Sequence, residues 1–188
     1  WAALGNDEWN YLKVLPYFRK METDEDVRDD FHGTDGPVPV LRHQDEARLP
    51  IQEAFYQACL GAGFAGGTDM NGPGPYGVSF LPMNNPDGIR MSTALTHLNP
   101  IRHRLNLTVR GNALARRVVF EGKRAIGVEV ESEGEVFIVE GDEIVLSSGG
   151  IRSPHLLMLS GVGPADQLHE AGIALVHELR GVGQHLKN

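Results

Sequence analysis

Residues 143–164 read EIVLSSGGIRSPHLLMLSGVGP. The nearly continuous apolar run at 143–148 is typical of a β-strand that is buried on both faces. A pair of glycines follows, and then a helix is predicted with Ser153 as its N-cap, Pro154 as its first residue and Gly161 at its end. Strand, glycine turn and helix together predict one βα unit in a fold that mixes helices with a sheet.

The turn of this unit is a candidate ligand site. Gly149 and Gly150 have no Cβ, so a ligand can approach their backbone closely. The N-terminus of the following helix directs free N–H groups at whatever lies there. An ordinary βα turn, in which small residues serve close packing, explains the same pattern equally well. The residues alone leave both interpretations open.

Short β-prone segments, separated by glycine turns, precede this unit. Such segments joined by tight turns predict an antiparallel β-meander. The segments are 105–109, 117–120, 125–131 and 136–139, and the turns are 121–123 and 133–134. After the unit we expect a short helix at 164–171 and a last strand at 173–176.

The first half of the chain is predicted to consist of helices separated by long loops. Asp7 or Asn10 caps a first helix, which Pro16 is expected to kink or break. Pro50 opens a second helix that ends at Gly61.

For three other stretches of the first half we expect a long loop, a short helix and an acidic segment. Residues 66–88 are rich in Gly, Pro and Asn, and loops of this length are usually lids or binding loops. Ser92 is expected to cap a short helix that residues 99–100 end. The acidic run at 22–30 has carboxylates for a cation, but we expect a solvated, mobile loop there.

Composition and charge exclude several classes of function. Lys and Arg number 17 against 25 Asp and Glu, and the net charge of −8 argues against nucleic acid as a partner. No apolar run approaches the ~18 residues that a membrane span needs. Cys59 is the single cysteine, which is consistent with a reducing compartment, so we expect a cytoplasmic protein.

Motifs for other chemistries are misplaced or missing. Residues 61–66 match the GxGxxG pattern, but a predicted helix precedes them and a loop follows, whereas a dinucleotide fingerprint lies between a strand and a helix. The eight histidines show no metal-ligand spacing, so we expect solvated or locally bonded histidines and no metal site. The sequence has no GxSxG elbow for a serine hydrolase.

Residues 148–164 closely resemble the second signature of the glucose–methanol–choline (GMC) oxidoreductases, in the branch of choline dehydrogenase and related alcohol dehydrogenases. They combine small residues, a Ser-Pro pair, an apolar helix and Ser-Gly-aliphatic-Gly in one register. Further similar segments extend the resemblance over essentially the whole chain: 1–18, which ends in Val-Leu-Pro-Tyr-Phe, then 69–72, 90–94, 106–109, 121–125 and 181–183.

The resemblance implies a two-domain flavoprotein of which this chain is an internal fragment. It implies that residues 99–188 are part of a Rossmann-like FAD-binding domain with an antiparallel β-meander. Residues 1–98 then supply helices and loops of the substrate and flavin-cover region. The expected fold class is therefore α/β, mixed with α+β.

The resemblance also implies a chemistry. In the family, FAD oxidises a small-molecule alcohol to a carbonyl compound, with hydride transfer to flavin N5 and a histidine that takes the hydroxyl proton. The family's dinucleotide fingerprint and its catalytic histidine have no counterpart in these residues. We therefore assign no catalytic residue, and we expect the chain to be inactive alone.

At the adenine end of FAD the resemblance implies three cofactor-binding residues, Ala115, Ser148 and Gly149. Ala115 stands where the family has a valine whose backbone contacts adenine. Two further departures are Gly150, where alanine is usual, and His185, where asparagine is usual.

Two hypotheses make different predictions about the surface. A fragment leaves apolar surface exposed and is expected to bind FAD poorly by itself and to form oligomers. The alternative is a small non-catalytic binding module that uses the loop at 66–88 and the Gly149 turn. Such a module predicts a monomer with a complete core.

Overall fold

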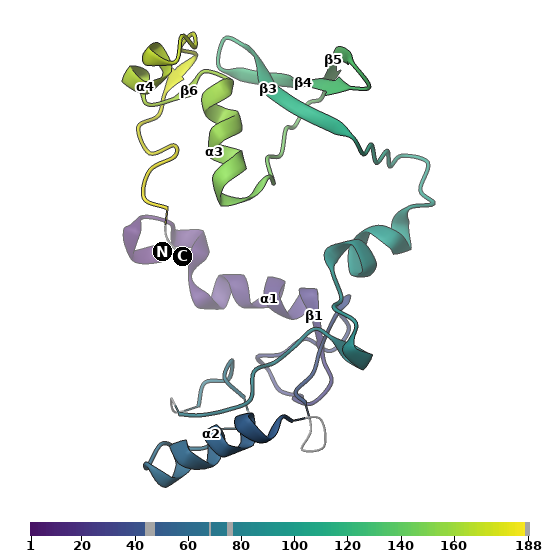
Figure 1. The fold of residues 1–188 in the computed structure, drawn as a ribbon, viewed down its shortest axis with the longest axis vertical. Coiled ribbons are helices and arrows are strands. Elements are labelled where there is room, and N and C mark those ends of the chain that lie inside the picture. Colours follow the sequence, from purple (N-terminus) through teal and green to yellow (C-terminus); the bar gives the residue numbers. More distant parts are fainter. Residues whose placement is uncertain (44–47, 68, 75–76, 187–188) are drawn as a thin grey trace. The chain divides into compact units, whose positions relative to one another are not determined.

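The chain forms two compact units, Trp1–Leu107 and Thr108–Asn188, in a computed structural model that describes residues 1–43, 48–67, 69–74 and 77–186 (Figure 1). Both units mix helices and short strands, which confirms the expected mixed fold class. No helix among the described residues is long and apolar enough to cross a membrane. The predicted assignment of 1–98 and 99–188 to two functional regions stays a prediction.

The first unit begins with helical turns and one longer helix. The turns are Ala2–Leu4 (η1) and Asp7–Trp9 (η2), and the helix is Tyr11–Met21 (α1). Asn10 caps α1 as predicted, because its Oδ1 accepts the backbone N–H of Lys13 at 3.0 Å. The predicted break at Pro16 is wrong, since α1 runs through it. Pro16 is exposed, so the carbonyl group that loses its helical partner can turn to water.

A short parallel pair of strands follows α1. Glu22–Asp24 (β1) pairs with Val38–Val40 (β2), and Glu22 lies opposite Val38. The expectation of a solvated loop at 22–30 is wrong for its first residues, because Asp24 is fully buried. Charge alone predicted exposure there, and the partners that bury Asp24 are distant in sequence.

The rest of the first unit follows the predicted helices in part. Pro50–Gly61 (α2) begins and ends as predicted. The short helix after Ser92 is Ala94–Leu98 (η5), and it continues into Asn99–Ile101 (η6) instead of ending at 99–100. Pro100 is tolerated there because it occupies the first turn of η6, where no backbone donor is needed. A further turn, Pro86–Gly88 (η4), lies in the long loop.

The second unit contains the predicted antiparallel meander. Its strands Ala113–Glu121 (β3), Arg124–Ser132 (β4) and Glu135–Glu140 (β5) pair in the order β3-β4-β5. The two tight turns between them contain Gly122 and Gly134, both at positive φ. The predicted strand at 105–109 is not formed, because no described strand pairs with it.

After the meander the chain forms Gly149–Leu159 (α3), Val162–Gly163 (β6), Ala165–Glu170 (α4) and His177–Glu178 (β7). Three expectations fail here. Residues 143–148 form no strand, since no described strand lies beside them to complete a ladder. Ser153 and Pro154 lie inside α3 instead of starting it. The last strand is two residues, parallel to β6, and begins after 173–176.

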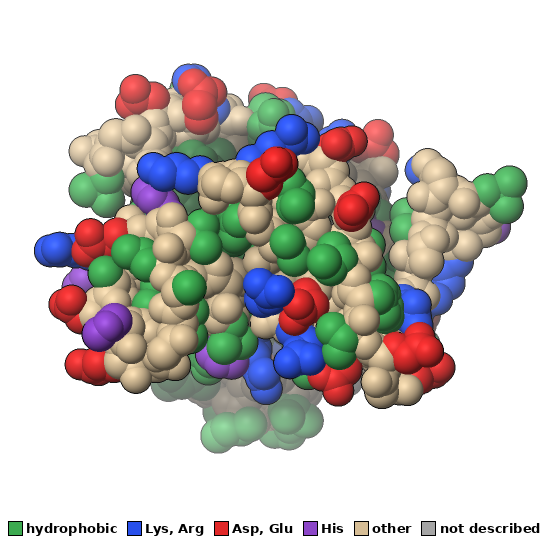
Figure 2. All heavy atoms as spheres, turned by 90° about the horizontal axis from the view of Figure 1, so that it is seen from above, with side chains coloured by type: hydrophobic (Ala, Val, Ile, Leu, Met, Phe, Trp, Pro, Cys, Tyr) green, Lys and Arg blue, Asp and Glu red, His purple; other side chains and the backbone are tan. Residues whose placement is uncertain are grey.

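The apolar core that the structure describes lies in the second unit. Six hydrophobic residues are buried, and they come from β3, β4, α3, β6, α4 and the loop after β7: Val118, Val130, Leu156, Val162, Leu168 and Val182. Among the described residues of the first unit, the buried side chains are polar instead: Asp24, His32, Arg42 and Thr96. Many large apolar side chains remain at the surface, and the face in Figure 2 shows them interspersed with charged groups.

Candidate functional site

The glycine turn at the start of α3 is open. Ser148 is the N-cap of α3, and its backbone N–H donates to the Oγ of Ser153 at 3.0 Å. Gly149 has φ +85°, a conformation that favours glycine. A Cβ placed on Gly149 would meet no atom within 4 Å, and one on Gly150 would meet the side chain of Leu186 alone, at 3.6 Å. The turn therefore has the room for close backbone approach that a dinucleotide requires.

The third predicted cofactor residue, Ala115, lies on β3 opposite Val130 and is exposed. The ladder shifts register between Ala115 and Arg117, which marks a β-bulge at this position. A bulge leaves one residue unpaired and re-aims the backbone beside it. Ala115, for which a backbone contact to adenine is predicted, therefore lies at an irregular part of the strand.

The structure joins β3 to α3 at one buried residue. The Oγ of Ser160 accepts the backbone N–H of Val118 at 2.7 Å and donates to the carbonyl of Leu156 at 2.6 Å. This contact lies at the C-terminal end of α3, whereas Ser148 and Gly149 lie at its N-terminal end. Sequence reasoning missed Ser160 as a structural link, because its partner Val118 lies 42 residues away.

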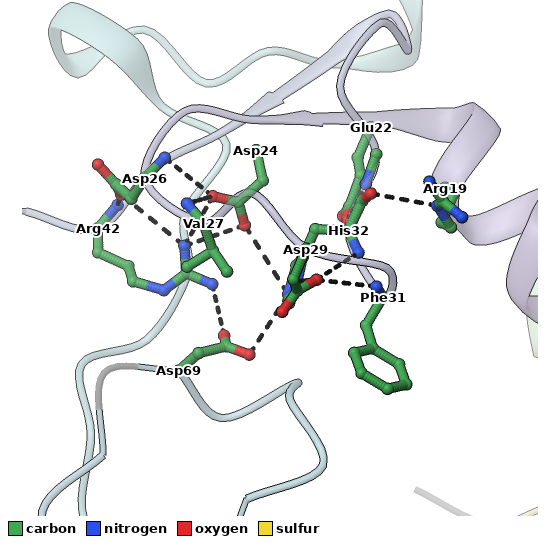
Figure 3. A network of polar contacts seen from close by, with 11 residues as sticks. Arg19, Glu22, Asp24, Asp26, Val27, Asp29, Phe31, His32, Arg42 and Asp69 are labelled. Atoms are coloured by element: carbon green, nitrogen blue, oxygen red, sulfur yellow. Dashed lines mark hydrogen bonds and ion pairs between the residues drawn. The ribbon is translucent and has the colours of Figure 1, made fainter.

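A second constellation, in the first unit, is a buried network of charges (Figure 3). The Nη1 of Arg42 donates to both carboxylate oxygens of Asp24, at 2.9 and 3.0 Å, and its Nη2 donates to Asp69. The backbone N–H of Arg42 donates to Asp26. Asp24 is 0% exposed and Arg42 is 6% exposed, so these charges are desolvated and depend on one another.

His32 lies in the same network and is 2% exposed. Its Nδ1 is 2.7 Å from an Asp29 oxygen, and its Nε2 is 3.3 Å from an oxygen of Asp69 and 4.0 Å from one of Asp24. Burial, the largest single influence, lowers the pKa of His32. The hydrogen bond that the ring donates to Asp29 and the charges of the three aspartates outweigh it and raise that pKa above the usual 6.5.

The carboxylates around His32 respond in the opposite direction. The hydrogen bond with His32 lowers the pKa of Asp29, although burial opposes it. Burial would raise the pKa of Asp69, but the hydrogen bond from Arg42 and the charges of Arg42 and His32 lower it. The network therefore favours charged aspartates beside a charged histidine.

The network also has the spacing of a cation site. Ligand atoms of Glu22, Asp24 and His32 lie within 4.8 Å of one another. Arg42 and a protonated His32 already bring positive charge to Asp24, the buried carboxylate of this group. Sequence reasoning missed this network, because it dismissed the acidic run as solvated and because the bonds from Arg42 to Asp24 and Asp69 span 18 and 27 residues.

The chain belongs to the GMC oxidoreductase family, whose model matches residues 1–188. It is 45% identical over 177 residues to an uncharacterised GMC-type oxidoreductase of Rhodococcus erythropolis, which covers 94% of this chain and 36% of that protein. It is 40% identical over 189 residues to an oxygen-dependent choline dehydrogenase of Photobacterium profundum, with 100% of this chain and 33% of that protein covered.

The fold agrees with the sequence comparison. An FAD-dependent oxidoreductase from Chaetomium thermophilum superimposes with a TM-score of 0.91 at 29% identity, over 100% of this chain and 35% of that one. The resemblance of 148–164 to a family signature is thereby confirmed as membership. The chain spans about a third of the length of the curated relatives it matches.

Proposed function

We propose that this chain is part of an FAD-dependent oxidoreductase that oxidises the CH–OH group of a small alcohol, and that it contacts the adenine end of the cofactor. The observation that carries the proposal is the open turn at Gly149, within the stretch that resembles the family signature. Family membership, the choline dehydrogenase of Photobacterium profundum and the FAD-dependent oxidoreductase of Chaetomium thermophilum support the same chemistry.

The proposed contacts to the dinucleotide are made by backbone. Ser148 and Gly149 would face it at the start of α3, where free N–H groups and the helix dipole favour an anionic group. Ala115 would contact adenine through its backbone beside the bulge in β3. When bound, FAD supplies the acceptor for hydride from the alcohol carbon.

We further propose that the chain does not catalyse this reaction alone. The general base that takes the alcohol proton would come from another part of a longer protein. In support, the chain spans about a third of its curated relatives, and the buried side chains described in the first unit are polar. Helix α1 exposes Leu12 to 76% and Tyr17 to 74%, which is apolar surface for further packing.

The same exposed surface favours this proposal over a stand-alone binding module, which would bury its own apolar residues. It also supports the expectation that the isolated chain forms oligomers. A cytoplasmic location remains our proposal for the protein, on the basis of its single cysteine, Cys59.

A comparison of cofactors tests the proposed function. The longer protein should retain FAD after desalting, and ADP should compete for the site, whereas FMN should bind much more weakly because it lacks the adenine that we place against this unit. The isolated chain should show no turnover of choline or other alcohols with FAD present. Equal retention of FMN and FAD would contradict the placement of adenine. Turnover by the isolated chain would contradict the proposal that the general base comes from another part of the longer protein.

A further inference from the structure

The two ring nitrogens of His32 face carboxylates on opposite sides. Nδ1 is 2.7 Å from Asp29, and Nε2 is 3.3 Å from Asp69. A neutral imidazole carries one N–H and can donate to one of them, while its other nitrogen would present a lone pair to a carboxylate oxygen. Nε2 and the facing oxygen of Asp69 form an ion pair without a hydrogen bond, so this contact is attractive only when His32 is a charged imidazolium ion.

The charges that surround His32 also favour its protonated form. Asp24, Asp29 and Asp69 face its ring, and a ligand atom of Glu22 lies within 4.8 Å of it. On the cationic side, Arg42 binds Asp24 and Asp69, and the Nε of Arg19 donates to the backbone carbonyl of His32 at 3.2 Å. A neutral His32 would leave an excess of buried negative charge, which is costly.

Asp69 connects this network to the long loop. The base of that loop is closed by backbone hydrogen bonds from Gly67 to Val78 at 2.9 Å and from Val78 to Ala65 at 2.8 Å. Beyond this base, the carboxylate of Asp69 reaches out of the loop to Arg42 and His32 (Figure 3). Asp24 and His32 belong to β1 and to the segment that leads toward β2, so Asp69 is where the loop meets the parallel strand pair.

We propose that His32 is a positioning residue: as a buried imidazolium ion it clamps Asp69, and with it the loop segment 69–74, onto the β1–β2 pair. Arg42 holds the other oxygen of Asp69 and keeps its charge at every physiological pH. His32 is the member of the pair that can lose its charge. Release of its proton therefore loosens the loop without detaching it, which makes the position of the loop dependent on pH.

The direction of the pH dependence follows from the direction in which the pKa of His32 is shifted. The pKa of His32 in the folded protein is raised above the usual 6.5. Its contribution to stability is thus complete below pH 6.5 and is lost as the pH rises through the folded-state pKa. The clamp is closed below pH 6.5 and opens as the pH rises through the folded-state pKa of His32.

The test measures the proton and the loop separately. Nitrogen-15 NMR of the His32 ring should show two N–H groups at pH 6, and a titration midpoint above 6.5. Hydrogen exchange of the amides at 69–72, corrected for the intrinsic dependence of exchange on pH, should become faster by about tenfold across that midpoint. The longer protein with its wild-type sequence suffices, so the test does not depend on a variant that folds.

Variants then identify the residue responsible. His32→Gln should show the fast exchange at 69–72 at every pH, and His103→Gln, which changes an exposed histidine of the same unit, should behave as wild type. A His32 midpoint at or below 6.5, or a single ring N–H at pH 6, would overturn the clamp. Exchange at 69–72 that does not change across the midpoint would overturn the link to the loop. None of these outcomes depends on FAD.

Discussion

The side-chain oxygen of Ser160 lies 2.7 Å from the backbone nitrogen of Val118, and this hydrogen bond joins the end of α3 to the edge of the meander. Both residues are buried, Val118 at 4% and Ser160 at 6% exposure. A buried N–H that loses its acceptor costs more than an exposed one, because water cannot replace the partner. The contact therefore fixes how α3, and the turn at its start, is held on β3.

Replacing this serine should weaken the second unit. Ser160→Ala leaves the N–H of Val118 without its acceptor and is expected to lower the free energy of unfolding by about 1–3 kcal/mol. Ser132→Ala is a matched control, since Ser132 is 4% exposed, lies in the same meander and makes no side-chain hydrogen bond among the described contacts. Urea denaturation measures both. An equal decrease in the free energy of unfolding in the two variants would show that the hydrogen bond to Val118 does not add to stability.

Gly161 is expected to be the least replaceable glycine of the family signature. Its φ is +83°, and a Cβ there would lie 2.4 Å from the carbonyl oxygen of Ala174. Gly172 has a similar φ of +69° but open space around it. Gly172→Ala should cost about 1 kcal/mol from backbone strain, and Gly161→Ala at least about 2 kcal/mol more from the clash. Thermal unfolding of the two variants checks this, and similar melting temperatures would contradict the close approach.

Acid should destabilise the first unit through its aspartates. The pKa values of Asp29 and Asp69 are lowered in the folded protein, so their contribution to stability is present above the usual 3.8 and is lost as the pH falls through the lowered values. Asp69→Asn should therefore lose less stability on acidification than wild type does, while being less stable at neutral pH. Asp35→Asn, an exposed control in the same unit, should keep the wild-type slope. Urea midpoints between about pH 5 and pH 2 give the slopes. The same slope in Asp69→Asn and wild type would refute the assignment.

Metal removal should leave the charge network unchanged. Arg42 and His32 already form ion pairs with Asp24, Asp29 and Asp69, so neither EDTA nor added zinc should shift the melting temperature. A zinc-dependent rise in the melting temperature that His32→Gln abolishes would show that the cluster of Glu22, Asp24 and His32 prefers an ion to a proton.

Local signals in the sequence predicted local structure. Asn10 and Pro50 set the starts of α1 and α2, and the turns at Gly122 and Gly134 set the registers of the meander. These residues act through their own backbone preferences or through hydrogen bonds to neighbours in the chain. Their effect can therefore be recognised without knowledge of the tertiary structure.

Features that need distant partners were missed or misjudged. The apolar run at 143–148 has the composition of a buried strand. A strand forms only by pairing with another strand, and no described strand pairs with this run, so it forms no strand and Val145 is 75% exposed. The buried network was missed for the opposite reason. The acidity of residues 22–30 suggests solvation, and no residue near Asp24 in the sequence indicates that Arg42 and Asp69 lie beside it in the fold.

Flavin occupancy in two glycine variants tests the central claim most directly. Gly149 and Gly172 both have positive φ and open surroundings, and both lie in the second unit, so alanine imposes comparable backbone strain at each. In the longer protein, Gly149→Ala should lose bound FAD, because its Cβ would stand where we place the dinucleotide. Gly172→Ala should keep the wild-type flavin content. Equal flavin content in the two variants would contradict the proposed contact at Gly149.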